Sequence, residues 1–259
     1  MSCILLVMLI AQIYDPPIRQ GLSAEESIMA NDLRDLYDEI RLVIQDTKVI
    51  ISKRRTIRGK GRDTTGAPGL ASSLNKAFKK SLESLGWCPL VAPGATKFQS
   101  TVDWYKGRRS PVKYERRLLG IGLEIQMGNN YQFNEDIRRL SEAFLGGYTV
   151  AGISIVASDV LAKHKADRGA YFSDAKGKLN RNLALLYAAQ ARRIPPILIL
   201  AVQHDGYNDD PDGYFEIQPV IYSREERVLK ATISPAKISN RKHPVIVKRM
   251  KTRMGLHGV

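Results

Sequence analysis

The chain has 259 residues, with 40 Lys and Arg against 26 Asp and Glu, so its formal net charge is +14. This length suits one large domain or two small ones, and an apolar content of 44% excludes a disordered chain. Two cysteines cannot build a disulfide framework or a four-ligand zinc site of their own, and they favour a reduced, cytoplasmic setting. So large a positive charge points to a polyanionic partner, most often nucleic acid and less often an anionic membrane.

The N-terminus carries a run of nine apolar residues, CILLVMLIA, at positions 3–11. A membrane span needs about 20 apolar residues, and a secretory signal begins with positive charge, which this run lacks. A buried helix or strand is therefore favoured over a targeting segment or a start codon assigned too far upstream.

Residues 23–52 are predicted to form one helix, because Ser23 and Glu26 have the spacing of a capping box and apolar residues recur at helical intervals. The basic, glycine-rich segment that follows, residues 53–69, is typical of an exposed loop. It is either a solvated linker or an arm that contacts DNA, and the sequence leaves both open.

Strands and helices alternate through the middle of the chain. A helix at residues 70–85 ends at Gly86, and strands at 101–106 and 120–127 are joined by an exposed basic connection. The elements that follow are, in order, a helix at 131–145, a buried strand at 150–157, a polar loop, a helix at 179–193 and a buried strand at 197–203.

This alternation predicts an α/β fold in which a mixed sheet is flanked by helices. We expect residues 1–69 to form an N-terminal helical segment and basic arm, and residues 70–205 to form the core. Residues 206–259 are expected to pack on that core as a basic C-terminal segment.

The common nucleotide-binding and hydrolase motifs are absent. The sequence has no phosphate-binding G-x-x-x-x-G-K-S/T loop, no dinucleotide fingerprint, no G-x-S-x-G elbow, no H-E-x-x-H and no pair of C-x-x-C motifs. The four histidines are scattered and are interpreted as surface residues rather than metal ligands.

Two acidic residues lie on the neighbouring strand candidates. Asp103 and Glu124 are 124 − 103 = 21 residues apart, and Gln126 shares the face of Glu124. Paired carboxylates with a neighbouring carbonyl, that of Ile125, form an oxygen site suited to magnesium, which could activate a water toward a phosphorus. Gln126 could then orient that water or contact the scissile phosphate. Alternatively, the polar side of this strand simply faces water.

The stretch GIGLEIQMGNNYQFNEDIRRLSEAFLGGYTVAGISIVA resembles the catalytic region of type II restriction endonucleases of the BglII kind, and the preceding helix, loop and TVDWYK strand are similar in arrangement. The resemblance covers about residues 70–175. It implies a PD-(D/E)xK restriction-endonuclease-like nuclease core of the E-x-Q variant. By position, Asp103 and Glu124 match the metal-binding acids and Gln126 matches the usual lysine, while Val102 replaces the proline.

The family implies a cytoplasmic, prokaryotic homodimer that cuts both strands of a short palindrome with Mg²⁺ within a restriction-modification system. A third acid often comes from the preceding helix in this fold, and Glu83 is the available candidate. Glu83 is also explained as a solvated helix residue near Lys79 and Lys80.

Candidate DNA contacts fall in the polar loop at residues 164–182, in the basic connection between the two strands and in the turn at 128–130. The long polar loop at residues 164–182 is the candidate for reading bases, and the basic connection is suited to phosphates. The candidates are Arg108, Arg109, Asn129, Asn130, Arg168, Tyr171, Ser173, Lys176, Lys178 and Arg181.

The leading hypothesis is a sequence-specific double-stranded DNA endonuclease that hydrolyses phosphodiesters with magnesium-activated water. Two other functions remain open from the sequence. One is a non-catalytic nucleic-acid-binding protein, and the other is a structure-specific repair or junction nuclease on the same fold.

Overall fold

The computed structural model describes residues 4–19, 21–53, 70–91, 101–109, 118–127, 132–163, 171–204 and 213–218. Several predicted features lie outside these ranges. They are the basic arm beyond Lys53, the turn of the β-hairpin, the turn at 128–131, the first part of the polar loop, and most of the C-terminal segment.

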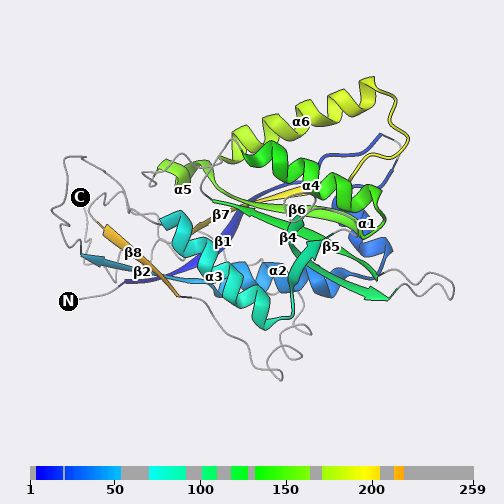
Figure 1. Cartoon of the computed structure of the whole chain (residues 1–259). Helices are drawn as coiled ribbons and strands as arrows, with labels where there is room; N and C mark the ends of the chain where they lie inside the picture. Colours follow the sequence, from blue (N-terminus) through cyan, green and yellow to red (C-terminus); the bar gives the residue numbers. More distant parts are fainter. Residues whose placement is uncertain are drawn as a thin grey trace.

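The described residues form one mixed sheet with helices on both faces, which confirms the predicted α/β class (Figure 1). The strands are β1 Ile4–Tyr14, β2 Lys48–Lys53, β3 Cys88–Val91, β4 Thr101–Arg109, β5 Leu118–Gln126, β6 Thr149–Ala157, β7 Ile197–His204 and β8 Gly213–Gln218. The helices are α1 Ala24–Ala30, α2 Arg34–Asp46, α3 Leu70–Ser84, α4 Phe133–Leu145, α5 Asp159–Lys163 and α6 Phe172–Ala188. The strand order is β3-β4-β5-β6-β7-β1-β2-β8.

The centre of the sheet follows the predicted order of elements. Strands β4 and β5 are antiparallel, and β5, β6 and β7 are parallel with helical crossovers between them. All nine residues of β6 are buried, as its continuous apolar run predicts. The expected basic connection is shorter than predicted, because β4 continues to Arg109 and β5 begins at Leu118.

The N-terminal apolar run forms β1, which lies inside the sheet. Residues Ile4–Val7 pair with β2, and Met8–Tyr14 pair with β7 across an irregularity after Ile10. One long strand therefore joins the central strands to the β2/β8 ribbon. Within the described part of the chain, no helix is long and apolar enough to cross a membrane.

The prediction of a single helix over residues 23–52 is wrong. The capping box exists, since the backbone N–H of Ser23 donates to Glu26 at 2.8 Å, but α1 ends at Ala30. Asp32 then adopts a left-handed conformation (φ 53°), which interrupts the helical hydrogen bonds before α2 begins. The last residues, KVIISK, are rich in β-branched side chains and pair with β1 and β8 as β2.

Helix α6 begins seven residues earlier than the predicted start at residue 179. Phe172, Ala175, Leu179 and Leu183 recur at helical spacing and are all buried, so the apolar stripe extends back through Gly177. An internal glycine costs only about 1 kcal/mol, which this packing offsets. The second half of the predicted base-reading loop is therefore helix.

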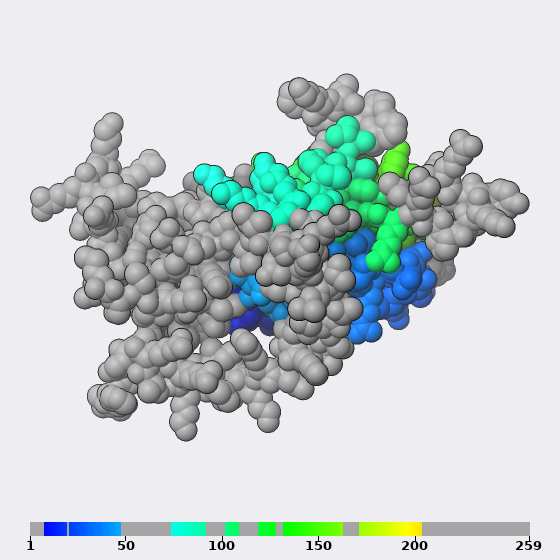
Figure 2. Space-filling model, turned by 90° about the horizontal axis from the view of Figure 1, so that it is seen from below, coloured from blue at the N-terminus to red at the C-terminus, as the bar shows by residue number. Residues whose placement is uncertain are grey.

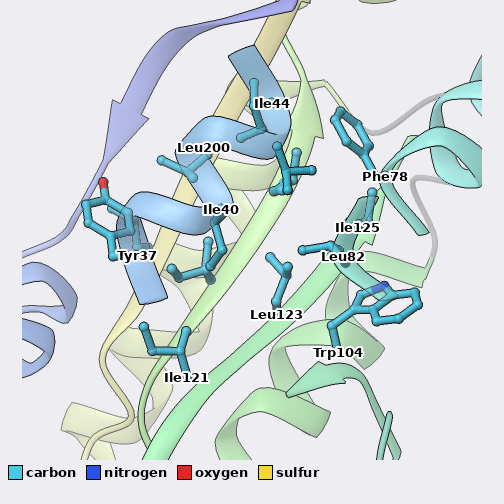
Figure 3. Packing of buried hydrophobic residues seen from close by; sticks show 14 of the residues in the cluster. Tyr37, Ile40, Ile44, Phe78, Leu82, Trp104, Ile121, Leu123, Ile125 and Leu200 are labelled. Atoms are coloured by element: carbon cyan, nitrogen blue, oxygen red, sulfur yellow. The ribbon is translucent and has the colours of Figure 1, made fainter. Parts of the chain in front are cut away.

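The helices form two layers. Helices α2 and α3 pack their apolar side chains against one face of the central strands, and α4 and α6 cover the other (Figure 1). Figure 3 shows the first face, where Ile121, Leu123 and Ile125 of β5 meet α2 and α3. Helices α2 and α3 contact each other on this face, and Figure 2 shows residues of both from that side. Full burial of each such side chain contributes about 1.5–3 kcal/mol.

Candidate active site

The predicted acids come together at the junction of β4 and β5. The two strands pair from Trp104 opposite Leu123 to Arg109 opposite Leu118, so Asp103 lies just beyond this register, beside Glu124. The backbone N–H of Asp103 donates to Oε1 of Glu124 at 3.2 Å. The side chain of Asp103 is 46% exposed and that of Glu124 only 1%. The site therefore has one open and one buried carboxylate.

The polar side of β5 does not face water. Glu124 and Gln126 are both buried and lie on the side covered by α4, whereas Leu123 and Ile125 face the opposite core. The alternative of an ordinary solvated strand face is thus excluded. Residue alternation along β5 was predicted correctly, but its polar face is packed as tightly as its apolar one.

Two glycines bring α4 close to this face. Gly122 of β5 and Gly152 of β6 are register partners, and Leu140 of α4 packs directly over both. A Cβ atom at Gly152 would lie 3.0 Å from Cβ of Leu140, and one at Gly122 would lie 3.2 Å from its Cδ2. Because neither glycine has a side chain, α4 approaches the strands closely enough for its polar residues to reach Glu124.

The residue of α4 next to Leu140 is Arg139, which contacts three carboxylates. Its Nη2 lies 2.7 Å from Asp136, its Nη1 lies 3.3 Å from Asp103, and its Nε lies 3.6 Å from Glu124. Each acid thus faces a different nitrogen of one guanidinium. Asp136 is 2% exposed and Arg139 is 21% exposed.

Sequence reasoning missed Asp136 and Arg139. The signal that could have found them is the position of Asp136 within the apolar stripe of α4, three residues after Phe133 and four before Leu140. A carboxylate on the buried side of a helix needs a partner, and Arg139 follows one turn later.

Burial dominates the electrostatics of the cluster. Desolvation, followed by the neighbouring charge of Asp103, raises the pKa of Glu124 to about 10 against the opposing effect of Arg139. Desolvation also raises the pKa of Asp136 to about 6, again opposed by Arg139. Without a second cation, Glu124 is therefore protonated at neutral pH.

Gln126 is held by the acid on α4. Its Nε2 donates to Oδ2 of Asp136 at 3.2 Å and to Oε1 of Gln132 at 3.4 Å. Asp136 therefore accepts from Arg139 with one oxygen and from Gln126 with the other. This fixes the side-chain amide of Gln126 beside Glu124, between β5 and α4.

The donor set suits a hard cation, although among the described residues no group of three or more Asp, Glu, His or Cys side chains is placed to hold a metal ion. Asp103 and Glu124 offer carboxylate oxygens from adjacent strands. Ile125 turns its side chain into the opposite core, so it can offer only its main-chain carbonyl. The cluster already accommodates one positive group, the guanidinium of Arg139, and oxygen donors of this kind are those that Mg²⁺ uses.

Glu83 is not brought to these acids. It lies on α3, which packs on the opposite face of the sheet, and its side chain is 52% exposed at 3.9 Å from Lys79. These contacts match the solvated helix residue that was the other explanation for Glu83. A role as third acid stays a prediction.

Most described DNA-contact candidates already have partners within the chain. Arg108 pairs with Asp35, and Ser173 donates to Asp159 through both its backbone N–H and its hydroxyl. The others lie on or next to α6: Tyr171 pairs with Ala157 in an isolated bridge, Lys176 lies over the ring of Tyr14, Lys178 pairs with Asp174, and Arg181 is exposed. Asn129, Asn130, Arg168 and the side chain of Arg109 lie outside the described residues.

The pair of Arg108 with Asp35 is the exposed ion pair of this set, and such pairs contribute only about 0–1 kcal/mol, so it does not exclude a contact of Arg108 with a phosphate. The bridge between Tyr171 and Ala157 also places the start of α6 at the carboxyl ends of β5 and β6, since Gln126 and Val156 are neighbours there. The candidates on α6 thus begin at the same edge of the sheet as the acids.

Comparison with known proteins gives one family. The model of the restriction endonuclease BglII/BglIII family matches residues 22–200, which include β4, β5, α4 and the whole acidic cluster. No curated protein matches the chain. The match covers well over half of the sequence and favours a sequence-specific endonuclease over a non-catalytic binding protein or a junction nuclease. The chain therefore belongs to the BglII/BglIII restriction endonuclease family and is a type II site-specific deoxyribonuclease.

Proposed function

We propose that the enzyme is a magnesium-dependent homodimer that cleaves both strands of a short palindromic DNA sequence. Its proposed active-site residues are Asp103, Glu124 and Gln126. The observation that carries this proposal is the cluster itself. A buried and an open carboxylate adjoin each other on neighbouring strands, and both lie near the same cationic group. An ordinary structural ion pair would not need two further buried or half-buried acids around one arginine.

Asp103, Glu124 and the carbonyl of Ile125 are proposed to hold the metal ion. Restriction endonucleases generally use a divalent metal, and magnesium is the one proposed here. When bound, magnesium lowers the pKa of a water and offsets charge on the phosphate. Two positive charges also favour ionisation of Glu124, whose pKa of about 10 is raised by burial and by Asp103.

Gln126 is proposed to orient the attacking water or to contact the scissile phosphate. Its amide is fixed by Asp136 and Gln132, so it presents a polar group at a constant position beside Glu124. A neutral amide differs from the lysine common in this fold because it cannot supply charge or a transferable proton. Gln126 therefore orients groups and does not act as a general acid.

Double-stranded DNA is proposed to approach the carboxyl ends of β5 and β6. Helix α6 begins at this edge with Tyr171 and Ser173, and Lys176, Lys178 and Arg181 follow on the same helix. Arg108 lies at the other end of β4, opposite Leu119 and paired with Asp35 of α2, so it is not one of the cations at this edge. A dimer with two such sites would match the symmetry of a palindrome. A prokaryotic cytoplasm, as the family implies, is the proposed location.

The test uses plasmid DNA incubated with the protein and Mg²⁺, with and without EDTA. We expect discrete fragments only with the metal, because a site-specific enzyme cuts at fixed positions. Glu124→Ala should abolish cleavage and leave DNA binding, measured by gel shift with Ca²⁺, largely intact. Undiminished cutting by Glu124→Ala would overturn the site assignment.

Glu135→Ala provides the matched control, since it removes an exposed carboxylate of α4 that pairs with Arg138 outside the cluster. This variant should cut at the wild-type rate. Sedimentation of the DNA-free protein tests the dimer separately. A protein that is monomeric both alone and on its DNA would contradict the homodimer but not the active site.

A further inference from the structure

The three-way contact of Arg139 suggests a role beyond holding α4 in place. A helix-stabilising arginine needs one acid, and Asp136 at 2.7 Å on the same helix already supplies it. Nevertheless the guanidinium also reaches Asp103 at 3.3 Å and Glu124 at 3.6 Å on two different strands. Its neighbour Arg138 is different, because among the described residues it pairs only with Glu135 and Glu142 on its own helix.

We infer that Arg139 is a resident cation of the carboxylate cluster, which a divalent metal ion must displace from Asp103 and Glu124. The inference rests on the proposed function, in which these two acids hold the metal. The guanidinium lies within 3.6 Å of both acids, so a metal ion coordinated by the same oxygens would come too close to a like charge. Arg139 and the metal therefore compete for one negative cluster.

The side chain of Arg139 has room to move away from Asp103 and Glu124. Its side chain is 21% exposed, whereas Glu124 and Asp136 are almost fully buried. The contact to Asp136 is the shortest of the three and comes from an acid that is not a proposed metal ligand. Arg139 can therefore keep Asp136 while its other nitrogens move away from the strands.

In the metal-free protein, Arg139 supplies the positive charge that the three carboxyl groups need. Asp103, Glu124 and Asp136 would otherwise place three carboxyl groups together beneath α4 with no cation among them. Arg139 holds them in position until the metal arrives, and the metal then takes over the charge. The residue is thus a positioning residue that sets metal affinity, rather than a catalytic one.

The experiment measures metal binding without DNA and without turnover. Mn²⁺ binding is titrated by calorimetry at pH 8 for the wild type, Arg139→Met and the control Arg138→Met. Removing the competing charge at position 139 should tighten Mn²⁺ binding at least fivefold. Arg138→Met should bind Mn²⁺ like the wild type, because its side chain lies outside the cluster.

A second readout separates this role from simple helix stabilisation. Arg139→Met should lower the Tm of the EDTA-treated protein, and saturating Mn²⁺ should raise that Tm by more than it raises the Tm of the wild type. If Arg139→Met does not fold, Arg139→Lys replaces it, because one ammonium cannot span three acids. Lysine should give a smaller gain in affinity of the same sign.

The two proposals fail in different ways. Unchanged or weaker Mn²⁺ binding by a folded position-139 variant would overturn the competition while leaving the metal site intact. If instead Glu124→Gln binds Mn²⁺ as tightly as the wild type, the ion does not bind at these acids and the proposed function itself is contradicted. Strong binding by the wild type, loss in Glu124→Gln and a gain in Arg139→Met would support both.

Discussion

The two faces of strand β5 are buried to a similar degree but hold opposite kinds of side chain. Toward α2 and α3, Leu123 and Ile125 join a continuous apolar core (Figure 3). Toward α4, Glu124 and Gln126 are equally enclosed, together with Asp136. Apolar burial stabilises the fold, whereas a buried carboxylate opposes it unless it is neutralised. One face thus stabilises the sheet, and the other uses that stability to hold reactive groups out of water.

Truncating the apolar face should have the largest effect on stability. Leu123 is fully buried between β5 and the helices α2 and α3, so Leu123→Ala should lower the free energy of unfolding by about 3 kcal/mol. Urea denaturation in EDTA measures this loss. The control is Leu185→Ala on α6, where the side chain is 69% exposed and the change should stay within about 0.5 kcal/mol. Equal losses in the two variants would contradict the packing described for this face.

Replacing the buried acid Glu124 should raise the free energy of unfolding, whereas truncating Leu123 should lower it. The pKa of Glu124 is about 10 in the folded, metal-free protein and near 4.5 ordinarily. Stability from the protonated carboxyl is therefore complete below about pH 4.5 and is lost as the pH rises toward 10. Glu124→Gln cannot ionise, so it should be more stable than the wild type at pH 8 and should gain on the wild type with each pH unit between 4.5 and 10.

Urea denaturation in EDTA at pH 6 and at pH 9 checks this prediction. The gap between Glu124→Gln and the wild type should widen with pH. Glu135→Gln serves as the control, because Arg138 lowers the pKa of that exposed carboxyl and no widening gain is expected. A gap that stays constant with pH would show that Glu124 does not titrate as described.

Moving α4 away from the strands should lower the free energy of unfolding by less than Leu123→Ala does. Gly152→Ala places a methyl group 3.0 Å from Cβ of Leu140, so the helix must move outward by a few tenths of an ångström. We expect a loss of about 1 kcal/mol in urea denaturation. Gly177→Ala is the matched control on α6, where the nearest atom is 3.9 Å away and alanine should be neutral or stabilising.

A double-mutant cycle sharpens this test. Combining Gly152→Ala with Leu140→Ala removes the two Cδ atoms of Leu140 that lie 3.1 and 3.2 Å from the added methyl group, so the double variant should be more stable than the sum of the single losses predicts. Strict additivity would mean that Leu140 and Gly152 do not set the distance between α4 and the sheet.

The smallest expected effect is at Glu83, on the far side of the sheet from the acids. Its side chain is half exposed and paired with Lys79, so Glu83→Gln should leave the cleavage rate within about twofold of the wild type. Initial rates on plasmid DNA measure this directly, with Asp103→Asn as the inactive comparison. A tenfold loss would instead identify Glu83 as the third acid.

The two faces of β5 differ in how far they could be predicted from the sequence. Alternation along β5 correctly separated Leu123 and Ile125 from Glu124 and Gln126, because strand periodicity is a local property. The side chains from α4 were missed, since the closeness of α4 depends on Gly122 and Gly152 lying side by side on two strands. Local periodicity carries no information about which distant residues become neighbours.

The errors in the helices have a related cause. The break between α1 and α2 depends on one residue, Asp32, whose left-handed conformation no apolar pattern reveals. The strand β2 is extended because β1 and β8 are available to pair with it. The early start of α6 could have been predicted, because Phe172 and Ala175 continue the apolar stripe of Leu179 and Leu183.

The position of β1 has a consequence for the order in which the protein can be assembled. Tyr14 pairs with Ile199 and Met8 with His204, so β1, which precedes the other described strands in the chain, has its central partner near the end of the core. Contacts between residues so far apart in sequence form slowly and cannot form during most of translation. Strand β1 can pair with the central strands only after β7 has left the ribosome. A chain interrupted before that point lacks a complete sheet. An incomplete chain that lacks β7 therefore cannot form the complete fold of this DNA-cutting enzyme.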